Sequence, residues 1–355
     1  MAMFDNPAVA PGSIVLVTGA NGFVGAHVAD QLLQQGYKVR GTVRDAKKHQ
    51  WLADLFTNKY GEGRFDLITV KDMKEPDAFD DAVSGVSGIV HVASVRSMNV
   101  TPEELLRITV AGTLGCLQAA SKEPSVQRFV LTSSSAAVRS LQAYRGTDTV
   151  SADEYDNQTL ALAQDIPAAA PPMQKFMIAY FASKVAAEQA FWKWVENHKP
   201  HFSTNSVLPC TIYGSPLDVP HQGFPSTSKI PLQILDGDTN SIPHVQRFYY
   251  VHVQDVARLH VAGLIDPATE NERIFAYAGP YSINEFFDIF ADIVPGYKAP
   301  QDIAGLDFPL AEIGPRGKAE ALLKKLGRPG FMGLAETVAS SVQTRVSDPS
   351  SSNTS

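Results

Sequence analysis

Three glycines spaced three residues apart stand where an apolar run gives way to a helical pattern near the amino terminus. The sequence reads TGANGFVGAHV over residues 18–28, directly after the apolar residues 14–17. Glycine lets a backbone turn sharply and approach a bound anion, and the free N–H groups that open the following helix then face a pyrophosphate. An ordinary strand-to-helix turn is the alternative, but this context favours a dinucleotide-binding turn formed by Gly19, Asn21, Gly22, Phe23, Val24 and Gly25.

Apolar runs alternate with helical patterns through the first two-thirds of the chain. Strands are expected at residues 14–18, 38–43, 65–70, 88–92, 128–133 and 204–209. Alternation of this kind predicts an α/β fold, a Rossmann-type doubly wound parallel sheet, over residues 12–210. Loops rich in Pro, Gly and Ser then predict a smaller C-terminal lobe at 211–345, from which 248–265 return to the first domain, and a disordered tail at 346–355.

Composition and charge exclude several classes of protein. The net charge of −7 argues against binding to nucleic acid or to an anionic membrane. Cys116 and Cys210 cannot build a disulfide framework and fall in no metal-ligand pattern, so we expect a reducing compartment and no metal. Neither a signal peptide nor an apolar run of about 20 residues is visible. We therefore expect a cytoplasmic protein, a monomer or a homodimer.

The end of the second expected strand indicates which dinucleotide is bound. An acidic side chain at this point would bind the 2′-hydroxyl of an adenosine ribose and repel a 2′-phosphate. The sequence VRGTVRDAKK instead places Arg44 there, with Lys47 and Lys48 close behind. A guanidinium can bind a phosphate in bidentate fashion, although the cluster could also be a solvated basic face. We expect NADP(H), bound by Arg44 and Lys48, while Asp45 caps the next helix.

The fourth expected strand should end beside the cofactor. It carries GIVHVAS over residues 88–94, so that Ala93 and Ser94 would line the path from adenosine to nicotinamide. His91 is interpreted as a packed core histidine, without a catalytic role.

Two further segments carry groups suited to acid catalysis. LTSSSAAV, residues 131–138, ends the fifth expected strand, and AYFASKVAAEQAFW, residues 179–192, is a helical pattern with Tyr180 and Lys184. Four residues apart on a helix, the two side chains share one face. An ammonium group beside a phenol favours the phenolate and makes the tyrosine a tunable acid.

Together, TGANGFVG, VRDAKK, TSSS and YFASK resemble the extended short-chain dehydrogenase/reductase family. Within it, the chain is similar to the NADPH-dependent branch of dihydroflavonol-reductase-like enzymes and fungal aldehyde/ketone (carbonyl) reductases. The segments YVHVQDVARLH, residues 250–260, and KKLGRPGF, residues 324–331, extend the resemblance over nearly the whole chain.

The resemblance implies a site and a reaction. It places the catalytic residues on Ser134, Tyr180 and Lys184, with Tyr180 and Lys184 also at the cofactor, Asp72 and Met73 near the adenine, and Pro209, Thr211 and Ile212 at the nicotinamide. The reaction implied is hydride transfer from NADPH to a carbonyl carbon, with Tyr180 as the proton donor and Ser134 holding the carbonyl oxygen. Thr109 stands where extended members often carry asparagine, which puts an asparagine-dependent proton relay in doubt.

Two other functions are weighed against reduction. Dehydratases of the family typically place an Asp-Glu pair directly after the catalytic Ser or Thr, where this chain has Ser135 and Ala136, and epimerases and dehydratases mostly favour NAD. Non-catalytic NADP-binding redox sensors generally lose the tyrosine and lysine, whereas Tyr180 and Lys184 are both present.

The substrate is the least constrained part of the site. Residues 172–177 and 222–225 are the candidates for the pocket wall, where Phe176, Met177 and Phe224 would favour a small apolar or aromatic carbonyl compound. Each of them could equally be core packing. The polar insertion at 141–170 is interpreted either as a cover over the site or as a surface loop.

Overall fold

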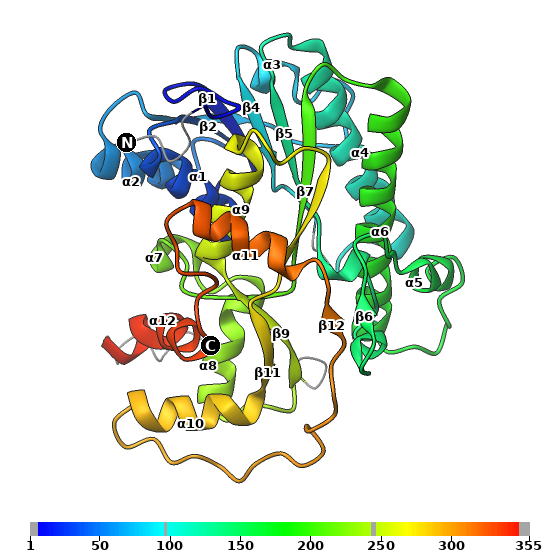
Figure 1. The fold of residues 1–355 in the computed structure, drawn as a ribbon, viewed down its shortest axis with the longest axis vertical. Helices are drawn as coiled ribbons and strands as arrows, with labels where there is room; N and C mark the ends of the chain where they lie inside the picture. The colour runs from blue at the N-terminus through cyan, green and yellow to red at the C-terminus, as the bar shows by residue number, and fades with distance from the viewer. Residues whose placement is uncertain (1–5, 96–97, 243–245, 348–355) are drawn as a thin grey trace.

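A central sheet of seven parallel strands organises the molecule (Figure 1), in the order β10-β7-β5-β4-β1-β2-β3. The computed structural model describes residues 6–95, 98–242 and 246–347. The strands of this sheet are β1 (Ile14–Thr18), β2 (Lys38–Val43), β3 (Phe65–Thr69), β4 (Gly88–His91), β5 (Arg128–Thr132), β7 (Ser203–Pro209) and β10 (Glu272–Ala276). The six strands expected from the sequence are confirmed to within one residue at each end, as is the doubly wound α/β fold. Their order reverses between β1 and β4, where doubly wound sheets bind their ligands.

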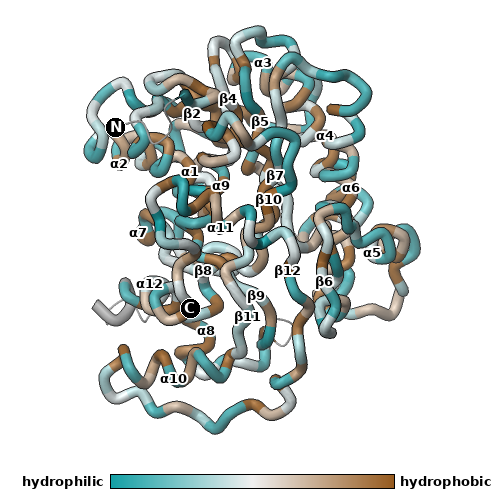
Figure 2. Tube along the Cα trace, viewed as in Figure 1, coloured by the Kyte–Doolittle hydropathy of each residue, from teal (hydrophilic) through white to brown (hydrophobic). Residues whose placement is uncertain are grey.

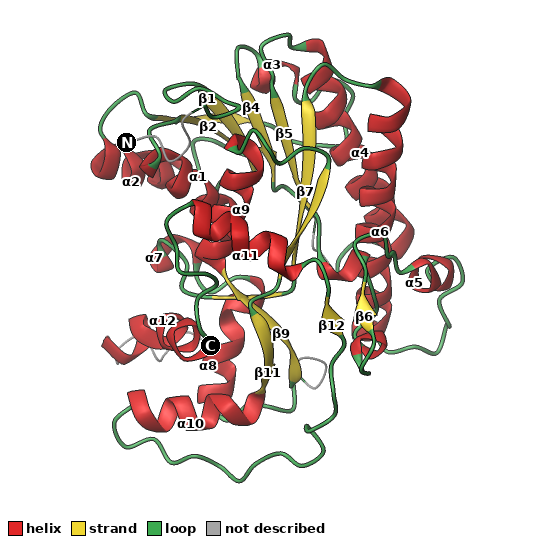
Figure 3. Cartoon of the chain, viewed as in Figure 1, coloured by secondary structure: helices red, strands yellow, loops and turns green. Residues whose placement is uncertain are grey.

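Helices cover both faces of the central sheet (Figure 3). One face carries α1 (Phe23–Gln34), α2 (Gln50–Tyr60), α9 (Val253–Ile265) and α11 (Arg316–Lys325), and the other carries α3 (Asp80–Val83), α4 (Pro102–Lys122) and α6 (Pro172–His198). On the first face α1 packs against α9, and on the second α4 packs against α6. Figure 2 shows hydrophobic residues concentrated where these helices meet the strands.

The strand β10 is not indicated by the sequence pattern, and contacts distant in sequence position it. The side chain of Asn205 on β7 accepts from the Glu272 N–H at 2.9 Å and donates to the carbonyls of Gly263 and Thr269 at 2.7 and 2.9 Å. β10 thereby pairs with β7 in parallel and becomes the edge of the sheet.

A smaller sheet forms the opposite end of the molecule (Figure 1). Its strands are β8 (Thr211–Tyr213), β9 (Arg247–His252) and β11 (Gly279–Ser282), in the order β11-β9-β8. They are accompanied by α8 (Ile230–Leu235), α10 (Ile283–Ile293) and α12 (Leu334–Ser347). Of residues 248–265, the strand part pairs in this smaller sheet and the helical part, α9, packs on the central one. Residues 348–355 of the expected tail lie outside the described residues.

The insertion at residues 141–170 lies along the flank of α6. It contains β6 (Thr149–Val150), which pairs with β12 (Glu312–Ile313), and α5 (Asn157–Leu162), which packs against α6. Arg139 holds it through ion pairs with Asp148 at 2.8 Å and Glu154 at 2.5 Å. Within the described residues, no helix is long and apolar enough to cross a membrane.

Four histidines are buried among the apolar side chains. Burial lowers the pKa of His91 and His252 to about 3 and that of His27 and His260 to about 4. The Val256 carbonyl can only accept a hydrogen bond, so His260 donates to it through Nδ1 at 2.8 Å and accepts from Thr132 through Nε2 at 2.7 Å. These histidines are therefore neutral in the folded protein at neutral pH.

The buried histidines predict loss of stability in mild acid. Well above pH 6.5 they are neutral in both the folded and the unfolded chain and contribute no pH dependence. As the pH falls from 6.5 towards 4, the unfolded chain binds protons that the folded chain excludes, so the free energy of unfolding falls. We expect a loss of about 1 kcal/mol per histidine between pH 6.5 and 5.5, measured by urea unfolding.

A matched variant separates this effect from other titrations. Replacing His260 by Gln should reduce the loss of stability between pH 6.5 and 5.5 by about 1 kcal/mol, whereas replacing the exposed His201 by Gln should leave the loss unchanged. The same free energy of unfolding at pH 7.5 and 5.5 in the wild type would contradict this account.

Candidate active site

The glycine turn between β1 and α1 has no room for larger side chains. Gly19 has φ +65°, and a Cβ atom at Gly25 would lie 2.2 Å from the carbonyl oxygen of Gly19. Gly22 is the N-cap of α1, and among the described residues no side chain caps this helix end. The first N–H groups of α1 are therefore available to an anion, as a dinucleotide pyrophosphate requires.

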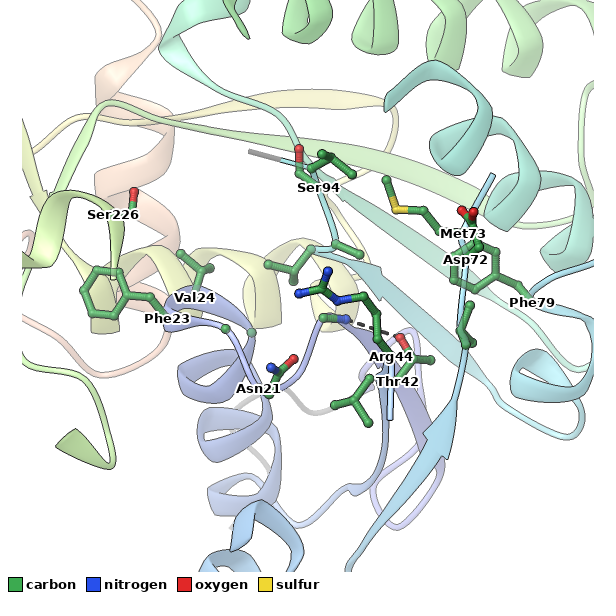
Figure 4. A pocket seen from close by; sticks show the side chains of 18 of the residues that line it. Asn21, Phe23, Val24, Thr42, Arg44, Asp72, Met73, Phe79, Ser94 and Ser226 are labelled. Atoms are coloured by element: carbon green, nitrogen blue, oxygen red, sulfur yellow. Dashed lines mark hydrogen bonds between the residues drawn. The ribbon is translucent and has the colours of Figure 1, made fainter. Parts of the chain in front are cut away.

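A cavity of about 650 Å³ opens in front of this turn (Figure 4). It is lined by twelve residues expected from the sequence: Gly19, Asn21, Gly22, Phe23, Val24, Gly25, Arg44, Asp72, Met73, Ala93, Ser94 and Ile212. Figure 4 shows the guanidinium of Arg44 reaching across the cavity, with the glycine turn on one side and Asp72 and Met73 on the other. The space thus runs along the carboxyl ends of β1, β2, β3 and β4.

Five of the expected cofactor residues do not line this cavity: Lys48, Pro209, Thr211, Tyr180 and Lys184, of which the last two lie on α6. Lys48 is exposed, and its N–H donates to Asp45 Oδ1 at 3.1 Å, so Asp45 caps a turn that precedes α2. Pro209 ends β7 and Thr211 begins β8, where Thr211 is buried.

Sequence reasoning missed several residues of the cavity wall. Thr42, at the end of β2, accepts from the Gly19 N–H at 3.3 Å and could have been found from its place opposite Thr18. Lys71, after β3, lines the cavity beside Arg44 and adds a second cation. Ser226 and Thr227 come from a loop rich in proline and serine, whose sequence gives no signal.

The segment at residues 222–225, a candidate for the pocket wall, contacts the glycine turn. Gln222 Nε2 donates to the carbonyls of Asn21 and Gly22 at 3.1 and 3.3 Å. Phe224 packs against the apolar core. The neighbouring α7 (Val219–Gln222) is held by His221, whose ring stacks on Trp51 at 4.9 Å.

The end of β4 is held against β1 by one hydroxyl group. Thr18 Oγ1 accepts from the N–H groups of Val92 and Ala93 at 3.0 Å and lies 3.0 Å from His91 Nδ1. His91 is buried, and burial and the charge of Lys184 lower its pKa to about 3. His91 therefore supports the cavity wall as a neutral core residue, as the sequence indicated.

Hydrogen bonds distinguish the three consecutive serines after β5. Ser133 is buried and donates to Glu188 Oε2 at 2.8 Å. Ser135 is also buried, and its carbonyl accepts from the hydroxyl of Tyr144 at 3.1 Å. Ser134 is half-buried and caps the short turn η1 (Ser135–Ala137) by accepting from the Ala136 N–H at 3.1 Å. Since η1 packs against α6, Ser134 lies next to that helix.

Tyr180 and Lys184 lie one turn apart on α6. Lys184 is buried and lines a narrow recess together with Ala93 and Ser94, which also line the large cavity. The lysine therefore lies at the inner end of the cofactor space. Tyr180 is half-buried, and its ring stacks on Phe176 with centroids 6.1 Å apart.

A second, smaller cavity is lined by Phe176, the residue on which Tyr180 stacks. It has a volume of about 200 Å³ and lies between the first turns of α4 and α6. Its walls are mainly apolar and consist of Met98, Val100, Pro102, Leu105, Pro172, Lys175, Phe176 and Ala179. Of the range 172–177 expected to face the substrate, Pro172, Lys175 and Phe176 line this cavity, and Met177 is not part of its wall.

Thr109 lines the recess of Lys184 where the family often has asparagine. Its hydroxyl donates to the Leu105 carbonyl at 2.7 Å, and Thr113, one turn on, donates to the Thr109 carbonyl at 2.9 Å. Both protons are therefore bound within α4.

Comparison with known proteins agrees with this arrangement. Residues 15–276 match the NAD dependent epimerase/dehydratase family. The chain is 37% identical over 341 residues to aldehyde reductase 2 of Sporidiobolus salmonicolor, a match that covers 95% of this chain and 97% of that protein. It is 36% identical over 347 residues to ketoreductase adrE of Penicillium roqueforti, with 96% and 99% covered.

A solved structure, Gre2 in complex with NADPH from Candida albicans, is similar with a TM-score of 0.79 and 26% identity, covering 94% of this chain and 99% of that one. The fold, the glycine turn and these similarities agree. The chain belongs to the NAD dependent epimerase/dehydratase family, within the extended short-chain dehydrogenases/reductases.

Proposed function

We propose that the protein reduces a ketone or an aldehyde to an alcohol with NADPH, and that Tyr180 donates the proton. The observation that carries this proposal is the continuity of the site. Ala93 and Ser94 line both the cofactor cavity and the recess of Lys184. Tyr180 lies one helical turn before Lys184 on α6. The relatives named aldehyde reductase and ketoreductase support the same reaction.

The cavity fits NADPH in shape and charge. The tight glycine turn and the uncapped start of α1 would hold the pyrophosphate, with Asp72 and Met73 near the adenine. Arg44 and Lys71 would bind the 2′-phosphate, while Ala93, Ser94 and Ile212 face the nicotinamide end. When bound, NADPH supplies the hydride that reduces the carbonyl carbon.

The residues of the chain supply orientation and the proton. Ser134 donates a hydrogen bond to the substrate's carbonyl oxygen and fixes its position. Tyr180 donates its phenolic proton to the same oxygen as negative charge develops there. Lys184, buried beside the cofactor cavity, places a positive charge that favours the phenolate left on Tyr180.

The small cavity beside Tyr180 favours an apolar substrate. Leu105, Phe176 and Ala179 would surround an alkyl or aromatic substituent of a small carbonyl compound.

We place the boundary between the cofactor-binding domain and the C-terminal lobe near residue 210. We further propose that the protein is cytoplasmic and is a monomer or a homodimer. The NAD-using epimerase and dehydratase reaction is less well supported, because Arg44 occupies the position of the ribose-binding carboxylate.

Replacing Tyr180 by Phe removes the proton donor and keeps the ring that stacks on Phe176. We expect kcat for carbonyl reduction to fall by about 10²–10⁴-fold, because general acid catalysis typically contributes that much. The measurement is NADPH oxidation followed by absorbance with a panel of ketones and aldehydes. Tyr297→Phe, on a loop after α10, is the matched control and should retain activity; retention of activity by Tyr180→Phe would contradict the assignment.

Replacing Arg44 by Ala should remove the preference for NADPH over NADH. Loss of a charge-assisted contact to the 2′-phosphate costs about 1.5–3 kcal/mol, so Kd for NADPH should rise roughly 10- to 100-fold while Kd for NADH changes little. Fluorescence titration measures both constants. Lys47→Ala, an exposed cation three residues on that does not line the cavity, should change neither. An unchanged preference in Arg44→Ala would leave the role of Arg44 without support.

A further inference from the structure

A buried carboxylate on α6 joins the helix to three neighbouring strands of the central sheet. Glu188 is completely buried and follows Lys184 by one helical turn. Its Oε2 accepts from Ser133 Oγ at 2.8 Å, and its Oε1 accepts from Ser206 Oγ, on β7, at 2.8 Å. Arg273, on β10, donates to both carboxylate oxygens at 3.0 Å.

Hydrophobic burial alone does not account for this arrangement. Removing a carboxylate and a guanidinium from water is costly, and apolar residues of similar size often stabilise a core as well or better. A fully bonded polar group, by contrast, allows only one relative position of the elements that it joins. Arg273 extends the network further, since it donates to the Glu154 carbonyl at 2.9 Å and lies over the Tyr155 ring at 4.1 Å.

The position of Glu188 relates this network to the reaction. Tyr180 and Lys184 precede it by two turns and one turn on the same helix, so a shift of Glu188 along the helix axis moves both. Ser133, which bonds to Glu188, directly precedes Ser134 in the chain. The bond between Ser133 and Glu188 thus links the strand that carries Ser134 to the helix that carries Tyr180.

We propose that Glu188 is a positioning residue for carbonyl reduction. Through Ser133, it fixes the position of α6 along its own axis relative to the end of β5. It thereby fixes the position of Tyr180 relative to Ser134. The bond to Ser206 holds the same carboxylate to β7, at a strand that carries none of the three catalytic groups. The inference rests on the reductase function proposed above and adds to it a residue that acts through the positions of Tyr180 and Ser134.

Two serines provide a matched test, because each makes one 2.8 Å hydrogen bond to the same carboxylate. If Glu188 is merely structural, the melting temperatures of Ser133→Ala and Ser206→Ala should fall by the same amount, and both variants should have the same kcat. Positioning predicts a similar fall in melting temperature but at least a tenfold lower kcat in Ser133→Ala alone, with KM for NADPH unchanged in both. Equal kcat in the two variants would overturn the inference.

A second pair of variants separates position from stability. Glu188→Gln leaves the buried Arg273 without its carboxylate and should lower both the melting temperature and kcat. Adding Arg273→Met removes the stranded charge, so the melting temperature should recover while kcat stays at least tenfold below that of the wild type. Recovery of kcat together with melting temperature would show that Glu188 is only structural.

Amide hydrogen exchange gives a readout that does not depend on turnover. Ser133→Ala should accelerate exchange in residues 133–138 and in α6 around Tyr180, whereas Ser206→Ala should not. Exchange that is the same in the two variants overturns the positioning role. Absence of NADPH oxidation by the wild type with every carbonyl compound would instead refute the proposed function, so the two failures are distinguishable.

Discussion

The contact on which the site depends is the close approach of α1 to the end of β1. The backbone at Gly25 lies so near the carbonyl of Gly19 that a Cβ atom would overlap it at 2.2 Å. This approach lets α1 start directly at the strand end and exposes its first N–H groups to a ligand. Thr42 and Gln222 then hold the turn from two sides, through the Gly19 N–H and through the carbonyls of Asn21 and Gly22. The geometry of the anion site is therefore set by backbone atoms, and side chains only support it.

Local charge, rather than overall charge, determines which dinucleotide the site suits. The chain carries a net charge of −7, yet Arg44 and Lys71 both border the cavity at the ends of adjacent strands. Asp72 lies close by but is engaged by Lys74, whose ammonium lies 3.4 Å from its carboxylate and whose N–H donates to it. A cationic wall is thus built within an acidic protein, which agrees with recognition of a phosphate and not with general binding of polyanions.

Local sequence patterns were sufficient to predict the strands and the turn whose structure depends on neighbouring residues in the chain. Six strands of the central sheet follow from apolar runs, and most of the cofactor cavity follows from the glycine turn and from the strand ends. The strand β10 could not be predicted, because its pairing depends on the Asn205 side chain about 70 residues away. Ser226 and Thr227, which begin the short 3-10 helix η3 (Ser226–Lys229), line the cavity although no local sequence pattern indicates it. Glu188 reads as an ordinary helix residue, because its partners come from three separate strands.

The recess that the buried Lys184 lines is surrounded by hydroxyl groups that are bonded to other parts of the protein. This recess is lined by the hydroxyl-bearing residues Thr109, Thr113, Thr132 and Ser133. Each of these hydroxyl groups has a partner elsewhere: a carbonyl of α4 for the first two, the neutral His260 for Thr132 and Glu188 for Ser133. Because their protons are bound elsewhere, only their oxygen lone pairs are left to face the recess, which Glu188 also lines.

Thr109, which stands where the family often has asparagine, is one of these bonded hydroxyl residues. A side-chain amide could both donate and accept hydrogen bonds. The Thr109 hydroxyl donates its proton to the Leu105 carbonyl, so towards the recess it can only accept a hydrogen bond. Thr109 is therefore bonded within its own helix and presents no proton to the recess. On the mechanism proposed above, we therefore expect Tyr180 to be reprotonated from the side of the cofactor cavity rather than through α4.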